Sequence, residues 1–225
     1  MRIDAAGWPF IGAGIVTAAL VAAGAGSIYG AIALVLPAFF LFFFRDPERH
    51  ANLKPGEVVS PADGRVMVAG PATGSFASGG WLQVTIFLSP MDVHVNRMPV
   101  GGRVTAVTYH PGKFLPAYKR EAGDLNEHTE VTVDHDGQTI IVRQIVGVLA
   151  RRIVCRVRDG DRVEAGQRFG VMKFGSRMDV FLPTGSLIRV AVGDRVVAGV
   201  TVIATLPASV TAALPALGTA RVPVR

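Results

Sequence analysis

The chain has 225 residues, of which half are hydrophobic and only 18% are charged. This charged share is low for a soluble domain, which typically carries about 25% charged residues, and the excess of apolar residues lies at the N-terminal end. The net charge of +6 comes without a basic run interleaved with aromatic residues, which excludes an obvious nucleic-acid interface. The single cysteine, Cys155, excludes a disulfide framework.

The first predicted element is an apolar segment, residues 8–44, that contains no charged side chain. As one helix it would be about 55 Å long, well beyond the ~30 Å hydrocarbon core of a bilayer. A cluster of small residues marks the expected turn in its middle: Gly24, Gly26, Ser27 and Gly30. Residues 1–44 are therefore predicted to form a membrane anchor, either a helical hairpin that spans the bilayer or a re-entrant one that only inserts into it, with helices near 8–23 and 28–44.

Two other interpretations of this segment are a cleavable signal peptide and a buried hairpin in a soluble protein. A second apolar stretch and the basic residues Arg45, Arg49 and Lys54 follow it, which disfavours a signal peptide. Neither half has a polar face, which disfavours a core hairpin. Positive charge after the anchor places residues 45–225 on the cytoplasmic face of the cell membrane, where anionic headgroups attract a basic domain.

Beyond residue 56, short stretches rich in Val, Ile and Thr alternate with glycine turns, a pattern typical of β-strands. The predicted strands are 58–59, 65–69, 81–88, 103–109, 130–133 and 139–148. Residues 111–128 lack strand character and are predicted to form a long functional loop with one helical turn.

An internal repeat follows, because residues 160–166 (GDRVEAG) return as residues 193–199 (GDRVVAG). Paired hairpins of this kind resemble the barrel-sandwich modules of biotinyl and lipoyl carriers. The predicted fold class is therefore mainly β, a small β-sandwich or barrel behind an α-helical membrane hairpin.

The pair Gly175-Ser176 would by itself indicate only a turn. Four other segments, however, accompany it in a fixed order: FFRDP at 43–47, SPADG at 60–64, FLSPMDVHVNRMP at 87–99 and NEH at 126–128. Together, over about residues 39–203, they resemble the phosphatidylserine decarboxylase proenzymes in their short form. These motifs are specific in combination, although each alone is weak.

This resemblance implies a covalent pyruvoyl cofactor made from Ser176. Loss of CO2 from an α-amino acid leaves a carbanion, which needs an electron sink that no ordinary side chain supplies. In the family, the serine attacks the preceding carbonyl, here that of Gly175, and the chain divides into a β chain (1–175) and an α chain (176–225). The two associate as a heterodimer, and the amine of phosphatidylserine forms a Schiff base with the pyruvoyl ketone before phosphatidylethanolamine is released.

The same resemblance assigns proton transfer to Asp63 and His94, which match the family's Asp/His pair. Histidine suits this task because its unperturbed pKa lies near working pH. Longer members carry a second histidine where this chain has Arg97. Either His94 therefore serves both self-cleavage and the later proton transfer, or another group shares the work, for which Asp92 is a candidate. The supporting residues Asn126 and Glu127 match a family motif without an assigned role. No metal site is expected, because the five histidines lack ligand spacing along the chain.

Three alternatives stay open. Lys173 between the two repeats is the candidate for biotinylation or lipoylation in a carrier module, although the flanking acidic residue of such carriers is absent. The chain could instead be a structural membrane-anchored β domain that never cleaves. It could also be an archaetidylserine decarboxylase, with the same chemistry on a different lipid core.

Overall fold

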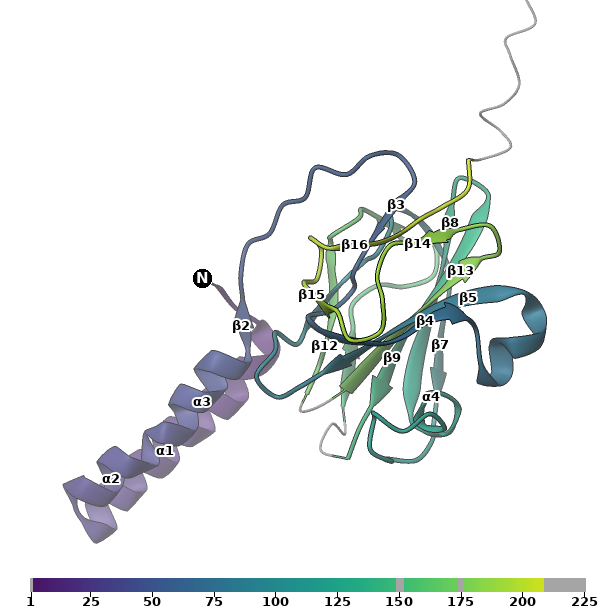
Figure 1. Cartoon of the computed structure of the whole chain (residues 1–225). Coiled ribbons are helices and arrows are strands. Elements are labelled where there is room, and N and C mark those ends of the chain that lie inside the picture. The colour runs from purple at the N-terminus through teal and green to yellow at the C-terminus, as the bar shows by residue number, and fades with distance from the viewer. Residues whose placement is uncertain (1, 149–151, 174–175, 209–225) are drawn as a thin grey trace, which may run out of the picture.

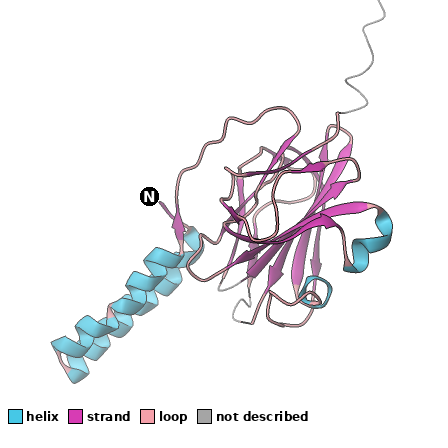
Figure 2. Cartoon of the chain, viewed as in Figure 1, coloured by secondary structure: helices cyan, strands magenta, loops and turns pink. Residues whose placement is uncertain are grey.

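The computed structural model describes residues 2–148, 152–173 and 176–208. A helical hairpin projects from a β domain in which most strands belong to one curved sheet (Figures 1 and 2). The mainly β class with an N-terminal helical hairpin, predicted from the sequence, is confirmed.

The hairpin consists of α1 (Trp8–Ala25), α2 (Ser27–Ala33) and α3 (Val35–Phe43). The turn falls at Gly26, inside the predicted cluster, where a φ of 104° favours glycine. Close packing of the helices depends on small residues, since a Cβ added at Gly14 would lie 3.1 Å from Pro37. Together, η1 (Ala5–Gly7) and α1 are long and apolar enough to cross a membrane.

Both ends of the hairpin are fastened to the β domain. Strand β1 (Arg2–Ile3) pairs with β2 (Arg45–Asp46), which brings the start of α1 beside the end of α3. Buried Asp4 caps η1 through the Ala6 amide at 2.9 Å and accepts a hydrogen bond from Arg156 at 2.7 Å. The hairpin is therefore held in a defined position and does not hang on a linker.

The principal sheet has eight antiparallel strands in the order β11-β7-β8-β9-β13-β5-β4-β15 and curls into a half-barrel. Its strands are β4 (Gly64–Pro71), β5 (Trp81–Leu88), β7 (Gly102–His110), β8 (His128–His135), β9 (Gln138–Val146), β11 (Arg162–Val163), β13 (Ser176–Pro183) and β15 (Arg195–Val196). Two three-stranded sheets complete the domain: β10 (Ile153–Cys155), β12 (Arg168–Met172) and β6 (Val95–Arg97); and β14 (Leu187–Ile188), β16 (Val202–Thr205) and β3 (Glu57–Val59).

The two faces of the principal sheet differ in chemistry. On β13, Met178 and Val180 point into the hydrophobic core, whereas Arg177 and Asp179 point to the outer face, because successive side chains alternate. The outer face is covered by η2 (Gly74–Gly79) and by the 111–127 loop with its single helical turn, α4 (Ala122–Leu125). The predicted loop and helical turn are confirmed.

The repeat found in the sequence closes the half-barrel. Its copies lie at opposite edges of the sheet, where β11 pairs with β7 and β15 pairs with β4. Beyond these strands Gly166 and Gly199 meet, and a Cβ on Gly199 would lie 3.5 Å from Gly166 Cα. A second repeat, PADGRV at 61–66 and PVGGRV at 99–104, leads into the bulged strands β4 and β7. The domain is thus built from two related halves, and only one carries an aspartate, Asp63, before its glycine.

Candidate active site

Ser176 is the first residue of β13 and lies in the middle of the principal sheet. Its backbone is opposite Leu88 of β5 and Val146 of β9, and its side chain shares the inward face with Met178. The residue is fully buried, and its Oγ has no hydrogen-bond partner in the described part of the chain. Leaving a buried hydroxyl unpaired costs about 1–3 kcal/mol, so such a group needs a functional explanation. Gly175 lies outside the described residues.

His94 comes from the turn between β5 and β6. Its carbonyl accepts a hydrogen bond from the Met172 amide at 3.3 Å, which places His94 beside the strand end that leads to Ser176. Its fully buried ring stacks on Phe43, the last residue of α3, at a centroid distance of 4.2 Å. The catalytic candidate therefore lies where the helical hairpin joins the β domain.

The protonation state of His94 follows from its surroundings. Burial lowers the pKa of His94 to about 4, opposed by a hydrogen bond to the Asp92 carbonyl and by the charge of Asp92. That hydrogen bond joins Nδ1 to the carbonyl oxygen at 3.0 Å, so Nδ1 carries the proton and Nε2 carries the lone pair. The imidazole is neutral near pH 7 and equipped to accept a proton at Nε2.

Asp63 is held in place by a partner that the sequence did not single out for this role. Arg49 donates two hydrogen bonds to the carboxylate, at 2.5 and 2.8 Å, and the Ala198 amide donates a third at 2.8 Å. The negative charge of Asp63 acts to raise the pKa of His94, although burial dominates. The structure thus brings Asp63 into the electrostatic environment of His94 while its oxygens engage Arg49. Sequence analysis used Arg49 only as evidence of membrane orientation.

Asp92 organises the turn that presents His94. Its carboxylate accepts a hydrogen bond from the Ser89 amide at 2.8 Å, and its carbonyl orients the His94 ring. Arg45, just after the hairpin, donates to the neighbouring Met91 carbonyl at 2.6 Å. In the structure Asp92 therefore positions His94, which is compatible with its predicted supporting role.

Arg97 occupies the position of the second histidine of longer relatives but faces another part of the molecule. It is buried and donates to the Asp46 carboxylate at 3.3 Å, the Pro47 carbonyl at 2.8 Å and the Gly166 carbonyl at 3.0 Å. Asp46 also pairs with Arg168 at 2.6 Å. Arg97 therefore secures the segment that leaves the hairpin.

Asn126 and Glu127 connect the long loop to the strand beside Ser176. The Asn126 amide exchanges hydrogen bonds with the backbone of Leu115 at 2.9 and 2.8 Å and donates to the Val146 carbonyl at 2.8 Å. The Glu127 carbonyl accepts a hydrogen bond from the Val146 amide at 3.1 Å. Because Val146 lies opposite Ser176, both residues support the start of β13.

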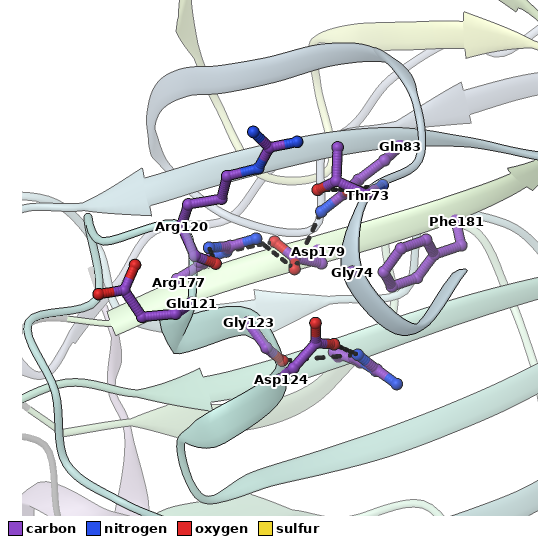
Figure 3. Close-up of a pocket in the computed structure, with 11 residues that line it drawn as sticks. Thr73, Gly74, Gln83, Arg120, Glu121, Gly123, Asp124, Arg177, Asp179 and Phe181 are labelled. Atoms are coloured by element: carbon purple, nitrogen blue, oxygen red, sulfur yellow. Dashed lines mark hydrogen bonds and ion pairs between the residues drawn. The ribbon is translucent and has the colours of Figure 1, made fainter. Parts of the chain in front are cut away.

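A polar cavity of about 240 Å³ lies on the outer face of the sheet (Figure 3). Arg177 donates to both oxygens of Asp179, at 2.7 and 2.8 Å, and Thr85 donates to the same carboxylate at 2.8 Å. Since Arg177 and Asp179 point away from the inward face of β13, this cavity does not contain the Ser176 hydroxyl. Its charged groups form a closed network that fastens η2 and the 111–127 loop to the sheet.

Comparison with known proteins shows the family of the chain. The model of the phosphatidylserine decarboxylase family matches residues 36–204. A phosphatidylserine decarboxylase proenzyme of Symbiobacterium thermophilum is 49% identical over 203 residues, which is 89% of this chain and 94% of that protein. Proenzymes of the same name from Geotalea uraniireducens and Paramagnetospirillum magneticum are each 42% identical over 91% of this chain, covering 97% and 87% of their own lengths. The chain therefore belongs to the phosphatidylserine decarboxylase family.

Proposed function

We propose that this carboxy-lyase family member converts phosphatidylserine to phosphatidylethanolamine with a pyruvoyl group made from its own Ser176. The observation that carries the proposal is the buried Ser176 hydroxyl, unpaired among the described residues, at the first position of a central strand and directly after a glycine. An orphaned nucleophile in such a place fits a residue that is consumed in processing.

The processing reaction balances with groups that the chain supplies. Ser176 Oγ bonds to the Gly175 carbonyl carbon while its proton passes to a base, for which neutral His94 is the candidate. The peptide C–N bond then breaks to give an ester, and the Ser176 nitrogen takes up that proton and becomes a free amine. Loss of the Ser176 α-proton to a base expels the Gly175 carboxylate and leaves dehydroalanine, which tautomerises to an imine. Water adds to the imine carbon, and the nitrogen leaves as ammonia. Glycine before the nucleophile exposes the carbonyl, because it has no Cβ and tolerates a strained backbone.

The sheet explains how two cleaved chains would remain one molecule. Strand β13 begins at Ser176 and pairs with β5 on one side over its full length and with β9 on the other. An α chain of residues 176–225 would therefore stay bound between two strands of the β chain (1–175). This pairing supports the heterodimer that the family resemblance implies.

A pyruvoyl group at Ser176 would supply the electron-accepting carbonyl that stabilises the carbanion left by CO2. The surrounding residues have separate tasks. Buried His94 can hold a proton on Nε2 and return it to the substrate Cα, and Asp92 keeps the ring in the required tautomer. The Arg49–Asp63 pair sets the charge near that ring, and the closed packing around Phe43 keeps water out.

We infer that the hairpin lies in the cell membrane with the β domain on the cytoplasmic face. Large apolar side chains on the hairpin are exposed, among them Leu20 at 69% and Ile28 at 74%. Since His94 stacks on the last residue of α3, an inserted hairpin would put the site at the depth of a lipid headgroup. The basic residues that follow the hairpin favour the cytoplasmic side.

A double substitution in the hairpin tests this placement. Leu20→Asp with Ile28→Asp is expected to move most of the protein from the membrane fraction to the soluble fraction, because each acidic residue costs about 2.5–3.5 kcal/mol near a bilayer centre. The matched control is Leu187→Asp with Val192→Asp, which adds the same charge at exposed apolar positions of the β domain (54% and 66%). Equal sedimentation of the two variants would refute the hairpin as anchor.

The proposed activity is tested with purified full-length protein in mixed detergent–phosphatidylserine micelles. We expect one phosphatidylethanolamine and one CO2 per serine lipid consumed, measured by mass spectrometry and CO2 release. Archaetidylserine micelles are the parallel arm, and a clear preference for them would transfer the same chemistry to the other lipid core. No turnover of either lipid by the processed protein would contradict the proposal.

The structure also bears on the carrier alternative. Lys173 is half-buried, its Nζ lies 4.8 Å from the centre of the Phe10 ring, and burial lowers its pKa. A carrier lysine must project from a hairpin tip so that its attached group can swing between sites. Contact with the helical hairpin prevents this, so the carrier function is disfavoured.

A further inference from the structure

Two histidines and a glutamate meet on the outer face of the principal sheet. His110 ends β7 and His128 begins β8, and the two are direct cross-strand partners with rings stacked at a centroid distance of 4.5 Å. Glu130 follows two residues after His128 and so points to the same face. One ring nitrogen of each histidine and a carboxylate oxygen of Glu130 lie within 4.8 Å of one another.

The hydrogen bonding of His128 leaves one ring nitrogen ready to bind a metal ion. Its Nδ1 donates to the Asn126 carbonyl at 2.8 Å, so the lone pair is on Nε2. The side chain is 5% exposed, and Nε2 is buried with no hydrogen-bond partner among the described residues. A backbone carbonyl on the second ring nitrogen is the usual support of a metal-ligating histidine.

Glu130 and His110 supply the other two ligand atoms, and solvent can reach them. Glu130 accepts a hydrogen bond from Arg143 at Oε2 at 2.8 Å, which fixes the carboxylate, and one of its oxygens lies within 4.8 Å of the histidine nitrogens. His110 is only half-buried, so the cluster can be reached from solvent. Arg143 is also held by Asp124 at 3.4 Å, which limits how far its charge can turn toward the cluster.

We propose that His110, His128 and Glu130 form a binding site for a divalent metal of the Zn²⁺ class. Two imidazoles and one carboxylate are a common donor set for zinc, with water in the fourth position. The expectation of no metal site rested on spacing along the chain, whereas His110 and His128 meet only through the register of β7 and β8. The inference does not depend on the proposed decarboxylase activity.

The position of the site suggests what the metal does. His110 and His128 flank the 111–127 loop on its two sides, so a metal bound to both would join the two ends of that loop. The loop in turn contacts the two strands at the candidate active site, β9 through Asn126 to the Val146 carbonyl and β13 through the Lys119 carbonyl to Arg177. Metal binding is therefore expected to stabilise the loop beside the start of β13.

The test uses full-length protein in detergent, freed of metal by a chelator and then titrated with Co²⁺ and competing Zn²⁺. We expect one equivalent of Co²⁺ to give a visible absorption band that Zn²⁺ displaces, and Zn²⁺ to raise the unfolding temperature. His110→Gln and Glu130→Gln should weaken binding at least tenfold; both groups are partly exposed, so the variants should fold. His128→Gln should abolish it.

The matched control is His135→Gln on the same strand. His135 also donates Nδ1 to a carbonyl, that of Gly101 at 2.6 Å, but it lies outside the cluster. Binding that persists in His110→Gln and Glu130→Gln, or that is lost equally in His135→Gln, would overturn the proposal. So would the absence of any one-equivalent site at micromolar Zn²⁺ in the wild-type protein.

Discussion

Ser176→Ala is expected to yield one uncleaved chain of 225 residues with no decarboxylase activity. The substitution removes the oxygen that must attack the Gly175 carbonyl, so neither cleavage nor the electron-accepting carbonyl can arise. Because Ser176 Oγ has no partner among the described residues, its removal breaks no hydrogen bond within that part of the chain. We therefore expect the free energy of unfolding to change by less than about 1 kcal/mol, or to rise, relative to the unprocessed wild-type chain. Denaturing electrophoresis, denaturant titration and lipid assay measure the three effects.

Ser186→Ala is the matched control for that experiment. Ser186 is also buried, but its Oγ donates to the Pro183 carbonyl at 2.8 Å. Its replacement should lower stability by about 0.5–1.5 kcal/mol while processing continues. A cleaved Ser176→Ala protein would refute the assignment of the nucleophile, and an unfolded one would refute the interpretation of its hydroxyl as structurally unnecessary.

His94→Gln is expected to slow self-cleavage by at least 100-fold, the usual scale for loss of a general base. Glutamine keeps a polar side chain of similar length but has no group that accepts a proton near neutral pH. Phe43→Leu serves as control, because it removes the ring that stacks on His94 and leaves the base. Time courses of chain cleavage measure both variants. Equal defects would mean that His94 acts through packing, and normal cleavage in His94→Gln would exclude it as the base.

The lowered pKa of His94 leads to a predicted dependence of stability on pH. Folded His94 has a pKa of about 4, below the ~6.5 of an unfolded histidine, so between these values the unfolded chain binds more protons. Stability should therefore fall by a few kcal/mol as pH drops from 6.5 toward 4, and the loss should shrink in His94→Gln. The free energy of unfolding, with His94 present and in His94→Gln, is best measured as a function of pH in the uncleaved Ser176→Ala background. An unchanged pH slope would contradict a buried, neutral His94.

Local patterns in the sequence predicted most of the fold. The apolar length and glycine cluster predicted the hairpin, whose turn falls at Gly26. Stretches rich in Val, Ile and Thr between glycine turns predicted β3, β4, β5, β7, β8 and β9 to within a few residues. These signals are local because helix and strand periodicity repeat over a few residues. Short β6, by contrast, gave no such pattern, because all three of its residues are buried.

The parts that could not be predicted depend on long-range register. Arg49 reaches Asp63, and His110 meets His128, only after distant segments pair, and a shift of one residue in register would turn every side chain to the other face. Arg97 shows the same limit, because the sequence indicated only that it stands where longer members carry a histidine, and the fold alone shows that its partner is Asp46. The motifs named the residues, but only the fold shows which of them meet.

An intact mass spectrum of the purified wild-type protein shows whether Ser176 becomes the cofactor. We expect two chains, residues 1–175 and 176–225, with the smaller one lighter by one ammonia than a chain that begins with an unmodified serine. That mass would report both the cleaved bond and the pyruvoyl group. A single chain of unmodified mass, or a cleaved chain with its serine intact, would contradict the proposal that Ser176 becomes the cofactor.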